Sequence, residues 1–319
     1  MRLACGRFAP LTTERMATPP LLQSGPHLAR AFGVLWNADL ALRHFDRAEA
    51  GEVPGPVITV RRVAELPSRQ AIARRQRGQI FADGFRFAWE SEATFDFHAP
   101  NRIDYLPGPD WHGSLPDSFY STAASLALCW NGMLPIHASA VEWRGQAYLL
   151  AGKAGAGKST LTAELLAHGA RLVGDDLTVL APATGGGFEV LPGRPAMRLH
   201  PDTADAVAAS AREAVPQDPR GKLLVRPVAR STASRLPLAG IILLGGLTGR
   251  LSPLQAVRML PPHQFRPRWS ALIPGHGQRL AWLVELAGTV PVTGLSALSG
   301  FDDAARLRRF EAAIAALSG

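Results

Sequence analysis

The first third of the chain is dominated by short runs in which hydrophobic and polar residues alternate, and one segment has a helical period instead. Residues 29–45 place their aromatic and aliphatic side chains on one side of a helix, which predicts a helix there. A β-branched run at 57–60 and an alternating run at 94–98 predict strands. Residues 80–87 alternate around an Asp-Gly pair, which predicts a hairpin with its tight turn at that pair.

A longer apolar segment, 117–130, predicts a helix that closes this part of the chain. Asp117 or Ser118 is expected to cap its first turn. Residues 1–20 mix Pro, Thr and Arg without a period and predict a loose tail. The pattern therefore indicates a small, strand-rich α+β domain at 21–132, in which we find no constellation of catalytic residues and whose role the sequence leaves open.

After residue 132 the pattern changes, and predicted strands alternate with helices to the end of the chain. The predicted strands are 136–143, 146–150, 171–174, 177–180, 188–191 and 241–244, and the predicted helices are 159–168 and 304–317. This alternation predicts a second domain of α/β (mixed α+β) class over residues 133–319.

Composition narrows the class of protein. The chain has 319 residues, of which 47% are hydrophobic and 19% charged, enough for a sizeable core and far from the composition of a disordered protein. Two cysteines exclude a disulfide framework and a four-cysteine zinc site. No segment is apolar enough to span a bilayer or to act as a signal peptide, so we expect a cytoplasmic protein without a membrane partner.

The net charge of +8 is spread unevenly. Residues 219–284 contain ten basic residues and no acid, which favours an anionic partner, although a solvated basic face is the simpler alternative. No nucleic-acid-reading motif accompanies this segment, which ranks a nucleic-acid partner low. Only three basic residues are lysines, namely Lys153, Lys158 and Lys222, and two of them lie in one short loop.

That loop matches the phosphate-binding pattern G-x-x-x-x-G-K-[ST], between an apolar strand and a helix. Glycines let successive backbone N–H groups turn inward around an anion, and the following helix directs its positive dipole end to the same point. Lys158 is expected to reach the β- and γ-phosphates of ATP and Ser159 to ligate Mg²⁺. The predicted nucleotide-binding residues are Gly152, Lys153, Ala154, Gly155, Ala156, Gly157, Lys158, Ser159 and Thr160.

A pair of acids, Asp175 and Asp176, follows the strand predicted at 171–174. One carboxylate at a strand end suits Mg²⁺, and its neighbour, which projects in another direction, can accept a proton from an attacking hydroxyl. An acidic pair in an ordinary strand-end turn is the structural alternative.

Three segments in this order carry a resemblance to a known family: His-Ala-Ser-Ala-Val at 137–141 with the loop that follows, Arg-Leu-Val-Gly-Asp-Asp at 171–176, and Pro-Gly-Arg-Pro-Ala-Met-Arg-Leu at 192–199. They are similar to the C-terminal kinase domain of HPr kinase/phosphorylase, and above all to its stand-alone relatives that phosphorylate serine in lasso-peptide precursors. The resemblance covers residues 133–240 best and implies a phosphoenolpyruvate carboxykinase-like P-loop kinase fold.

The resemblance also implies roles for individual residues. Lys158 and Ser159 would hold phosphates and metal, Asp175 the metal as well, and Asp176 would be the base. His137 matches the histidine that precedes the hairpin in the family, and it would orient an aspartate.

Further residues enter through the same resemblance. Arg194 or Arg198 would face the transferring phosphoryl group, and Lys222 would touch phosphate or substrate. The Pro-Gly-Arg-Pro segment lacks the acidic residue that HPr kinases usually have near this arginine, which argues against the reverse, phosphorolytic reaction.

The sequence thus predicts an ATP- and Mg²⁺-dependent kinase that transfers the γ-phosphoryl group to a serine hydroxyl of a peptide or small protein. Two alternatives stay open: a kinase of the same fold that acts on a small molecule, and a nucleotide-binding regulatory ATPase without an acceptor. Self-association into a homo-oligomer is left open as well.

Overall fold

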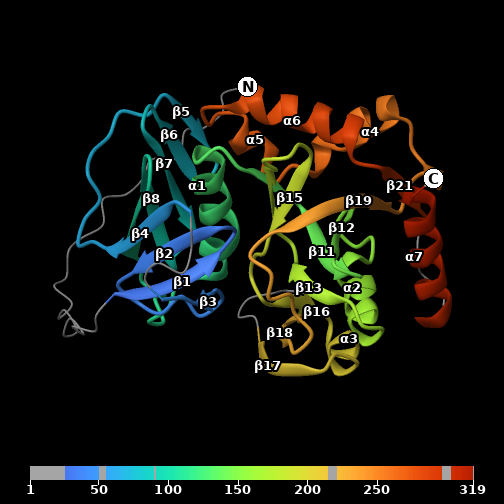
Figure 1. The fold of residues 1–319 in the computed structure, drawn as a ribbon. Coiled ribbons are helices and arrows are strands. Elements are labelled where there is room, and N and C mark those ends of the chain that lie inside the picture. The colour runs from blue at the N-terminus through green and yellow to red at the C-terminus, as the bar shows by residue number, and fades with distance from the viewer. Residues whose placement is uncertain (1–25, 50–54, 90, 215–220, 297–302, 319) are drawn as a thin grey trace, which may run out of the picture.

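The computed structural model describes residues 26–49, 55–89, 91–214, 221–296 and 303–318. The protein is of mixed α+β class, as expected, with one sheet on each side of a buried helix (Figure 1). The tail predicted for residues 1–20 lies outside the described residues. Within the described ranges, no helix combines the length and the apolar character needed to cross a membrane.

The first sheet has nine strands in the order β3-β1-β2-β4-β9-β8-β7-β6-β5 among the residues described. The strands are β1 His27–Ala31, β2 Val34–Ala38, β3 Asp46–Arg47, β4 Val57–Arg62, β5 Ala73–Arg75, β6 Gly78–Phe81, β7 Gly84–Trp89, β8 Ala93–His98 and β9 Arg102–Pro107. Neighbouring strands are antiparallel except β2–β4 and β4–β9, which are parallel. The strands predicted at 57–60 and 94–98 are confirmed as parts of β4 and β8.

The helix predicted over 29–45 is wrong, because this segment forms the hairpin β1–β2. Phe32 and Gly33 make its two-residue turn, and both have positive φ, 58° and 68°. The segment also fits a strand, since the buried Ala29 and Ala31 lie on either side of the exposed Arg30. The hairpin at 80–87 is confirmed, but its turn lies one residue earlier than predicted, because Phe81 pairs with Gly84.

The helix predicted over 117–130 is confirmed as a π-helical turn, Phe119–Ala123, followed by α1, Ala124–Trp130. It packs against one face of the first sheet, where Phe95 lies 5.6 Å from Phe119 and Trp36 lies 5.9 Å from Phe119 between ring centroids. Residues 119–130 of this helical segment are buried except Ser121 and Trp130, which are half-buried. Burial of large aromatic side chains against the sheet holds the helix in place.

A second sheet carries the later strands, with the path β10-β14-β15-β19-β12-β11-β13 and with β21 beside β19 and β20 beside β21; a small third sheet has the order β16-β18-β17. The strands are β10 Leu134–Ile136, β11 Ala138–Trp143, β12 Gln146–Gly152, β13 Arg171–Gly174, β14 Thr178–Pro182, β15 Phe188–Leu191, β16 Met197–Leu199, β17 Ala209–Ala214, β18 Leu223–Pro227, β19 Leu236–Leu244, β20 Gly249–Arg250 and β21 Val292–Leu295. Strands β12, β19 and β21 are parallel, and the other pairs are antiparallel.

The second half of the chain also carries six described helices. They are α2 Lys158–Ala167, α3 Pro201–Asp205, α4 Pro253–Met259, α5 Pro267–Ser270, α6 His276–Thr289 and α7 Asp303–Ser318, with a 3₁₀ turn at Pro261–His263. The helices predicted at 159–168 and 304–317 are confirmed as α2 and α7, whereas α3 to α6 were not predicted. Helix α4 does carry a full capping box, in which Ser252 and Gln255 bond each other's backbone N–H, so its start was readable in the sequence.

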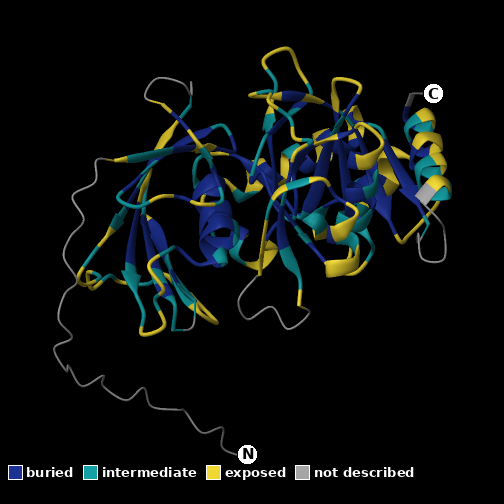
Figure 2. Ribbon diagram, turned by 90° about the horizontal axis from the view of Figure 1, so that it is seen from below, coloured by how far each residue is buried: buried dark blue, intermediate teal, exposed yellow. Residues whose placement is uncertain are grey.

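The hydrophobic core of the first sheet extends to the edge of the second sheet, whose other buried residues form two further clusters. Leu177, Val179 and Leu191 of the second half belong to the same buried cluster as the first sheet and α1. Arg279 of α6 is buried and donates to the Cys129 carbonyl oxygen at 3.1 Å, which ties the end of α1 to the second half. Figure 2 shows buried residues running through the strands of both halves, with exposed residues mainly in loops and on outer helix faces.

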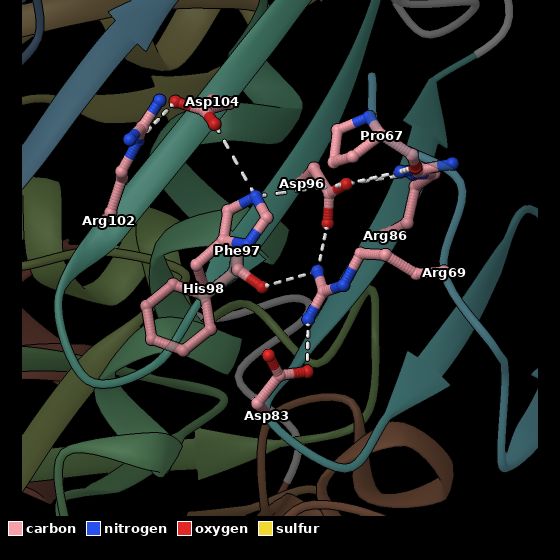
Figure 3. Close-up of polar contacts among 9 residues, drawn as sticks. All are labelled: Pro67, Arg69, Asp83, Arg86, Asp96, Phe97, His98, Arg102 and Asp104. Carbon is pink, nitrogen blue, oxygen red and sulfur yellow. Dashed lines mark hydrogen bonds and ion pairs between the residues drawn. The ribbon is translucent and has the colours of Figure 1, made fainter.

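The opposite face of the first sheet carries ion pairs instead of an apolar layer (Figure 3). Asp96 of β8 lies between Arg86 of β7 and Asp104 of β9 in the strand register. Its carboxylate is fully buried and binds Arg86 and Arg69, the latter at 2.5 Å. Asp104 in turn binds Arg102 at 2.8 Å. Arginines on both sides therefore offset two acids that face each other across neighbouring strands.

Replacing Asp96 by Ala should destabilise the fold by about 3–5 kcal/mol, because it leaves the largely buried guanidinium of Arg69 without its inner partner. Urea denaturation followed by circular dichroism measures this. Asp83→Ala is the matched control, since Asp83 binds the same arginine but its side chain is 71% exposed. Its loss should cost less than about 1 kcal/mol. If both variants lose the same free energy of unfolding, burial of Asp96 does not set the strength of its ion pair with Arg69.

Candidate active site

The glycine-rich loop connects β12 to α2, as the sequence predicted. Gly155 and Gly157 have φ of +82° and +88°, a conformation that side-chain-bearing residues rarely adopt. A Cβ atom at either position would meet no atom within 4 Å, so the backbone conformation is what requires glycine there. Gly157 is the N-cap residue directly before α2, and the N-terminal N–H groups of this helix therefore open into the loop.

Lys158 lies along the inside of the loop. Its Nζ donates to the carbonyl oxygens of Gly152 at 2.9 Å and Lys153 at 3.3 Å. Burial lowers the pKa of this ammonium, and the negative charges of Asp175 and Asp176 counteract part of the effect. The lysine is thus held over the loop with the acid pair nearby.

The remaining loop residues differ in exposure. Lys153, Ala154 and Gly155 are exposed at the tip of the loop, whereas Ala156, Gly157, Ser159 and Thr160 are half-buried.

Asp175 is buried and accepts hydrogen bonds on both carboxylate oxygens. The Ser159 hydroxyl lies 3.1 and 3.2 Å from its two oxygens. Oδ1 also accepts from the Ser139 hydroxyl at 2.5 Å, and Oδ2 accepts from the backbone N–H of Arg198 at 3.1 Å. Ser139 was not predicted as a site residue, although a fully buried serine in the apolar strand β11 is a signal that could have found it.

Asp176 points away from its neighbour. Its φ is +67°, a left-handed conformation that costs energy for a residue other than glycine. His137 holds it there, because the ring Nδ1 lies 3.0 Å from the Asp176 carbonyl oxygen and 3.2 Å from Oδ1. The strained backbone separates the two carboxylates, so that Asp175 faces Ser159 and Asp176 faces His137.

The charge state of Asp176 follows from its surroundings. Burial by itself raises the pKa of this carboxyl. The hydrogen bond with His137 and the charges of His137, Lys158 and Arg194 outweigh burial and hold the pKa below its ordinary value. Asp176 is therefore ionised at neutral pH.

Arg194 and Arg198 come from the segment around β16 and meet at one acid. Asp117 Oδ1 lies 2.5 Å from Nη1 of Arg194, and its Oδ2 binds Nη2 of Arg198. The expectation that Asp117 or Ser118 caps the helix is wrong, since Ser118 makes no capping hydrogen bond and the Asp117 side chain binds the two arginines. Burial lowers the pKa of Arg194 to about 10, so it stays charged at neutral pH.

The position of Arg194 depends on a contact with the first sheet. The β1–β2 turn reaches Pro192, whose carbonyl oxygen accepts from the Phe32 N–H at 2.7 Å. A Cβ atom on Gly193 would lie 2.4 Å from the Phe32 ring, so this position accommodates only glycine without a shift. The Phe32 ring is fully buried and packs directly beside the arginine loop.

Lys222 makes no polar contact with the acid pair among the interactions described here. It directly precedes β18 and is half-buried, and its charge is near enough to lower the pKa of Lys158. It does not line the cleft described next.

A cleft of about 1100 Å³ opens beside the acid pair and takes its walls from both halves of the chain. The lining residues that were predicted as site residues are His137, Ala154, Asp176, Arg194 and Arg198. Trp89, Trp111 and His112 of the first half lie on its walls as well. The cleft is large enough for a ligand beyond the phosphates themselves.

Comparison with protein-family models and with curated proteins finds no match for this chain.

Gly193→Ala should destabilise the protein by about 1–3 kcal/mol, because the added methyl group must displace the buried Phe32 ring. Gly185→Ala is the control, since a Cβ atom there meets nothing within 4 Å, and we expect a change below about 0.5 kcal/mol. Urea denaturation of both variants measures the difference. A cost at Gly193 no larger than at Gly185 would contradict the close packing of Phe32 on the arginine loop.

Proposed function

We propose that the protein is an ATP- and Mg²⁺-dependent kinase that phosphorylates a serine hydroxyl of a peptide or small protein, with a phosphoenolpyruvate carboxykinase-like P-loop kinase fold over residues 133–319. The observation that carries the proposal is the division of the acid pair. Asp175 binds the hydroxyl of Ser159 at the phosphate loop, while Asp176 lines the cleft. The sequence resemblance to HPr kinase/phosphorylase supports the same reading.

The residues around Ser159 fit a magnesium ion. Mg²⁺ prefers oxygen ligands and combines one or two carboxylates with phosphate oxygens and water. The Ser159 hydroxyl and the Asp175 carboxylate supply such oxygens side by side, and Ser139 fixes the carboxylate from behind. When bound, the ion would neutralise charge on the phosphate oxygens.

The phosphate loop and Lys158 would hold the triphosphate of ATP, with the N–H groups at the start of α2 directed to its oxygens. The acceptor would enter through the cleft. The oxygen of the acceptor hydroxyl forms a bond to the γ-phosphorus, and Asp176 accepts the proton of that hydroxyl. The bond between that phosphorus and the β–γ bridging oxygen breaks, and ADP leaves with the bond electrons.

His137 would serve as a positioning residue for the base. It bonds both the carbonyl and the carboxylate of Asp176, so the carboxylate keeps one orientation toward the cleft. Arg194 would offset charge on the transferring phosphoryl group, since its guanidinium stays protonated and lines the same cleft.

Asp176→Asn should lower phosphoryl transfer by about 10²–10⁴-fold, because the amide cannot take the proton, while ATP affinity stays nearly unchanged. The measurement uses γ-labelled ATP with an array of serine-containing peptides and follows labelled peptide and free phosphate separately. Asp175→Asn is the matched variant and should weaken Mg²⁺-dependent ATP binding instead.

The same assay separates the alternatives. Label on a small molecule in place of a peptide would point to a small-molecule kinase. Phosphate released without any labelled acceptor would indicate a regulatory ATPase. Full transfer activity in Asp176→Asn would remove this residue from the role of base.

His137→Gln should move the acid limb of the kcat–pH profile to higher pH. The bond and charge of His137 lower the pKa of Asp176, whereas burial raises it. Loss of the histidine therefore raises that pKa, and the base becomes protonated at a higher pH. A profile with an unchanged acid limb in His137→Gln would show that another group sets it.

A further inference from the structure

Asp117 holds both arginines of the cleft with one carboxylate. Each of its oxygens binds a different guanidinium, Oδ1 that of Arg194 and Oδ2 that of Arg198. All three residues line the cleft, and the Asp117 side chain is 25% exposed to it or to solvent. The chain thus supplies its own anion to a pair of cations that face a ligand-sized cleft.

One carboxylate does not neutralise two guanidinium groups. The Nε of Arg194 is buried, and among the residues described here it has no hydrogen-bond partner. His44 lines the same cleft. Its pKa is lowered to about 3 by burial and then by Arg194, Arg226 and other arginines nearby. An anion that entered this end of the cleft would meet the guanidinium groups of Arg194 and Arg198, beside the acids Asp117, Asp176 and Glu213 that line the same cleft.

The geometry around Asp117 is that of an anion site. Arginine forks bind carboxylate and phosphate oxygens through the same paired N–H donors. Asp117 reaches them from the segment before the first helix, and it is not used as the cap of that helix. Moving the Asp117 carboxylate away from the arginines would break no hydrogen bond that caps the helix. A ligand oxyanion would then pair with both guanidinium groups in its place.

We propose that Asp117 is an internal counter-ion that occupies an anion subsite formed by Arg194 and Arg198, and that a phosphate or carboxylate group of the ligand takes its place there. The subsite lies in the cleft of the proposed kinase, but its existence does not depend on phosphoryl transfer. The first half of the chain contributes to the site in this way, because Asp117 precedes β10 and belongs to the segment that packs on the first sheet.

The test measures binding of inorganic phosphate by calorimetry in a Lys158→Ala background, in which the phosphate loop is impaired. Asp117→Asn should tighten phosphate binding by about tenfold or more, because the competing charge is gone and both guanidinium groups become available. Arg198→Gln added to Asp117→Asn should abolish that gain.

Asp110→Asn is the matched control. Asp110 lines the same cleft, but its carboxylate binds the Ser91 hydroxyl and contacts neither arginine. Asp110→Asn removes one negative charge from the cleft, as Asp117→Asn does. A general electrostatic effect on phosphate affinity would therefore appear in both variants. A tightening confined to Asp117→Asn supports the subsite, and equal tightening in the two variants overturns it.

Three further results would overturn the proposal: unchanged phosphate affinity in Asp117→Asn, weaker affinity, or loss of the folded state, since a carboxylate that a ligand displaces is not essential to the fold. Acetate titrated in parallel identifies the source of the natural anion. Preference for phosphate indicates a phosphate group of the ligand, and preference for acetate indicates a carboxylate of the acceptor. These measurements are independent of transfer activity, so failure here and failure of the kinase assay are distinguishable.

Discussion

The hydrogen bonds to the Asp175 carboxylate tie the candidate site together. Ser159 belongs to the helix after the phosphate loop, Ser139 to strand β11, and the Arg198 N–H to strand β16, so one buried side chain joins three elements that are distant in sequence. Strand β13 delivers Asp175 to this point because it pairs with β11 at the edge of the sheet. Without this carboxylate the loop, the strand and the arginine segment would have no polar group in common.

Asp176, the next residue in the chain, directs its carboxylate to a different part of the site. The left-handed conformation of Asp176 turns its side chain away from Asp175, and His137 offsets the cost of that conformation with contacts to the carbonyl and the carboxylate. Two acids that are neighbours in sequence therefore occupy different environments, one saturated with hydrogen bonds and the other open to a cleft. This separation of environments would allow the two acids to serve the two different roles proposed for them.

The sequence predicted the second half of the fold better than the first. The glycine-rich loop, α2 and the acid pair are local features whose spacing is dictated by backbone geometry, and the structure brings them together. The segment 29–45 was misjudged because its apolar spacing fits a helix and a strand alike, and only the turn at Phe32 and Gly33 decides between them. Asp117 and Ser139 were not predicted as site residues for another reason. Arg194, which binds Asp117, lies 77 positions further along the chain, and Asp175, which binds Ser139, lies 36 positions further.

The shared core of the two halves limits how the protein can move. Phe32, Leu177 and Leu191 lie in one buried cluster, and Arg279 anchors the end of α1 to the helices of the second half. Moving the two halves apart would expose this cluster to water. The free-energy cost would be about 25 cal/mol for each Å² of apolar surface exposed. A shortened chain that lacks the first sheet would expose this apolar cluster to water and would lose one wall of the cleft.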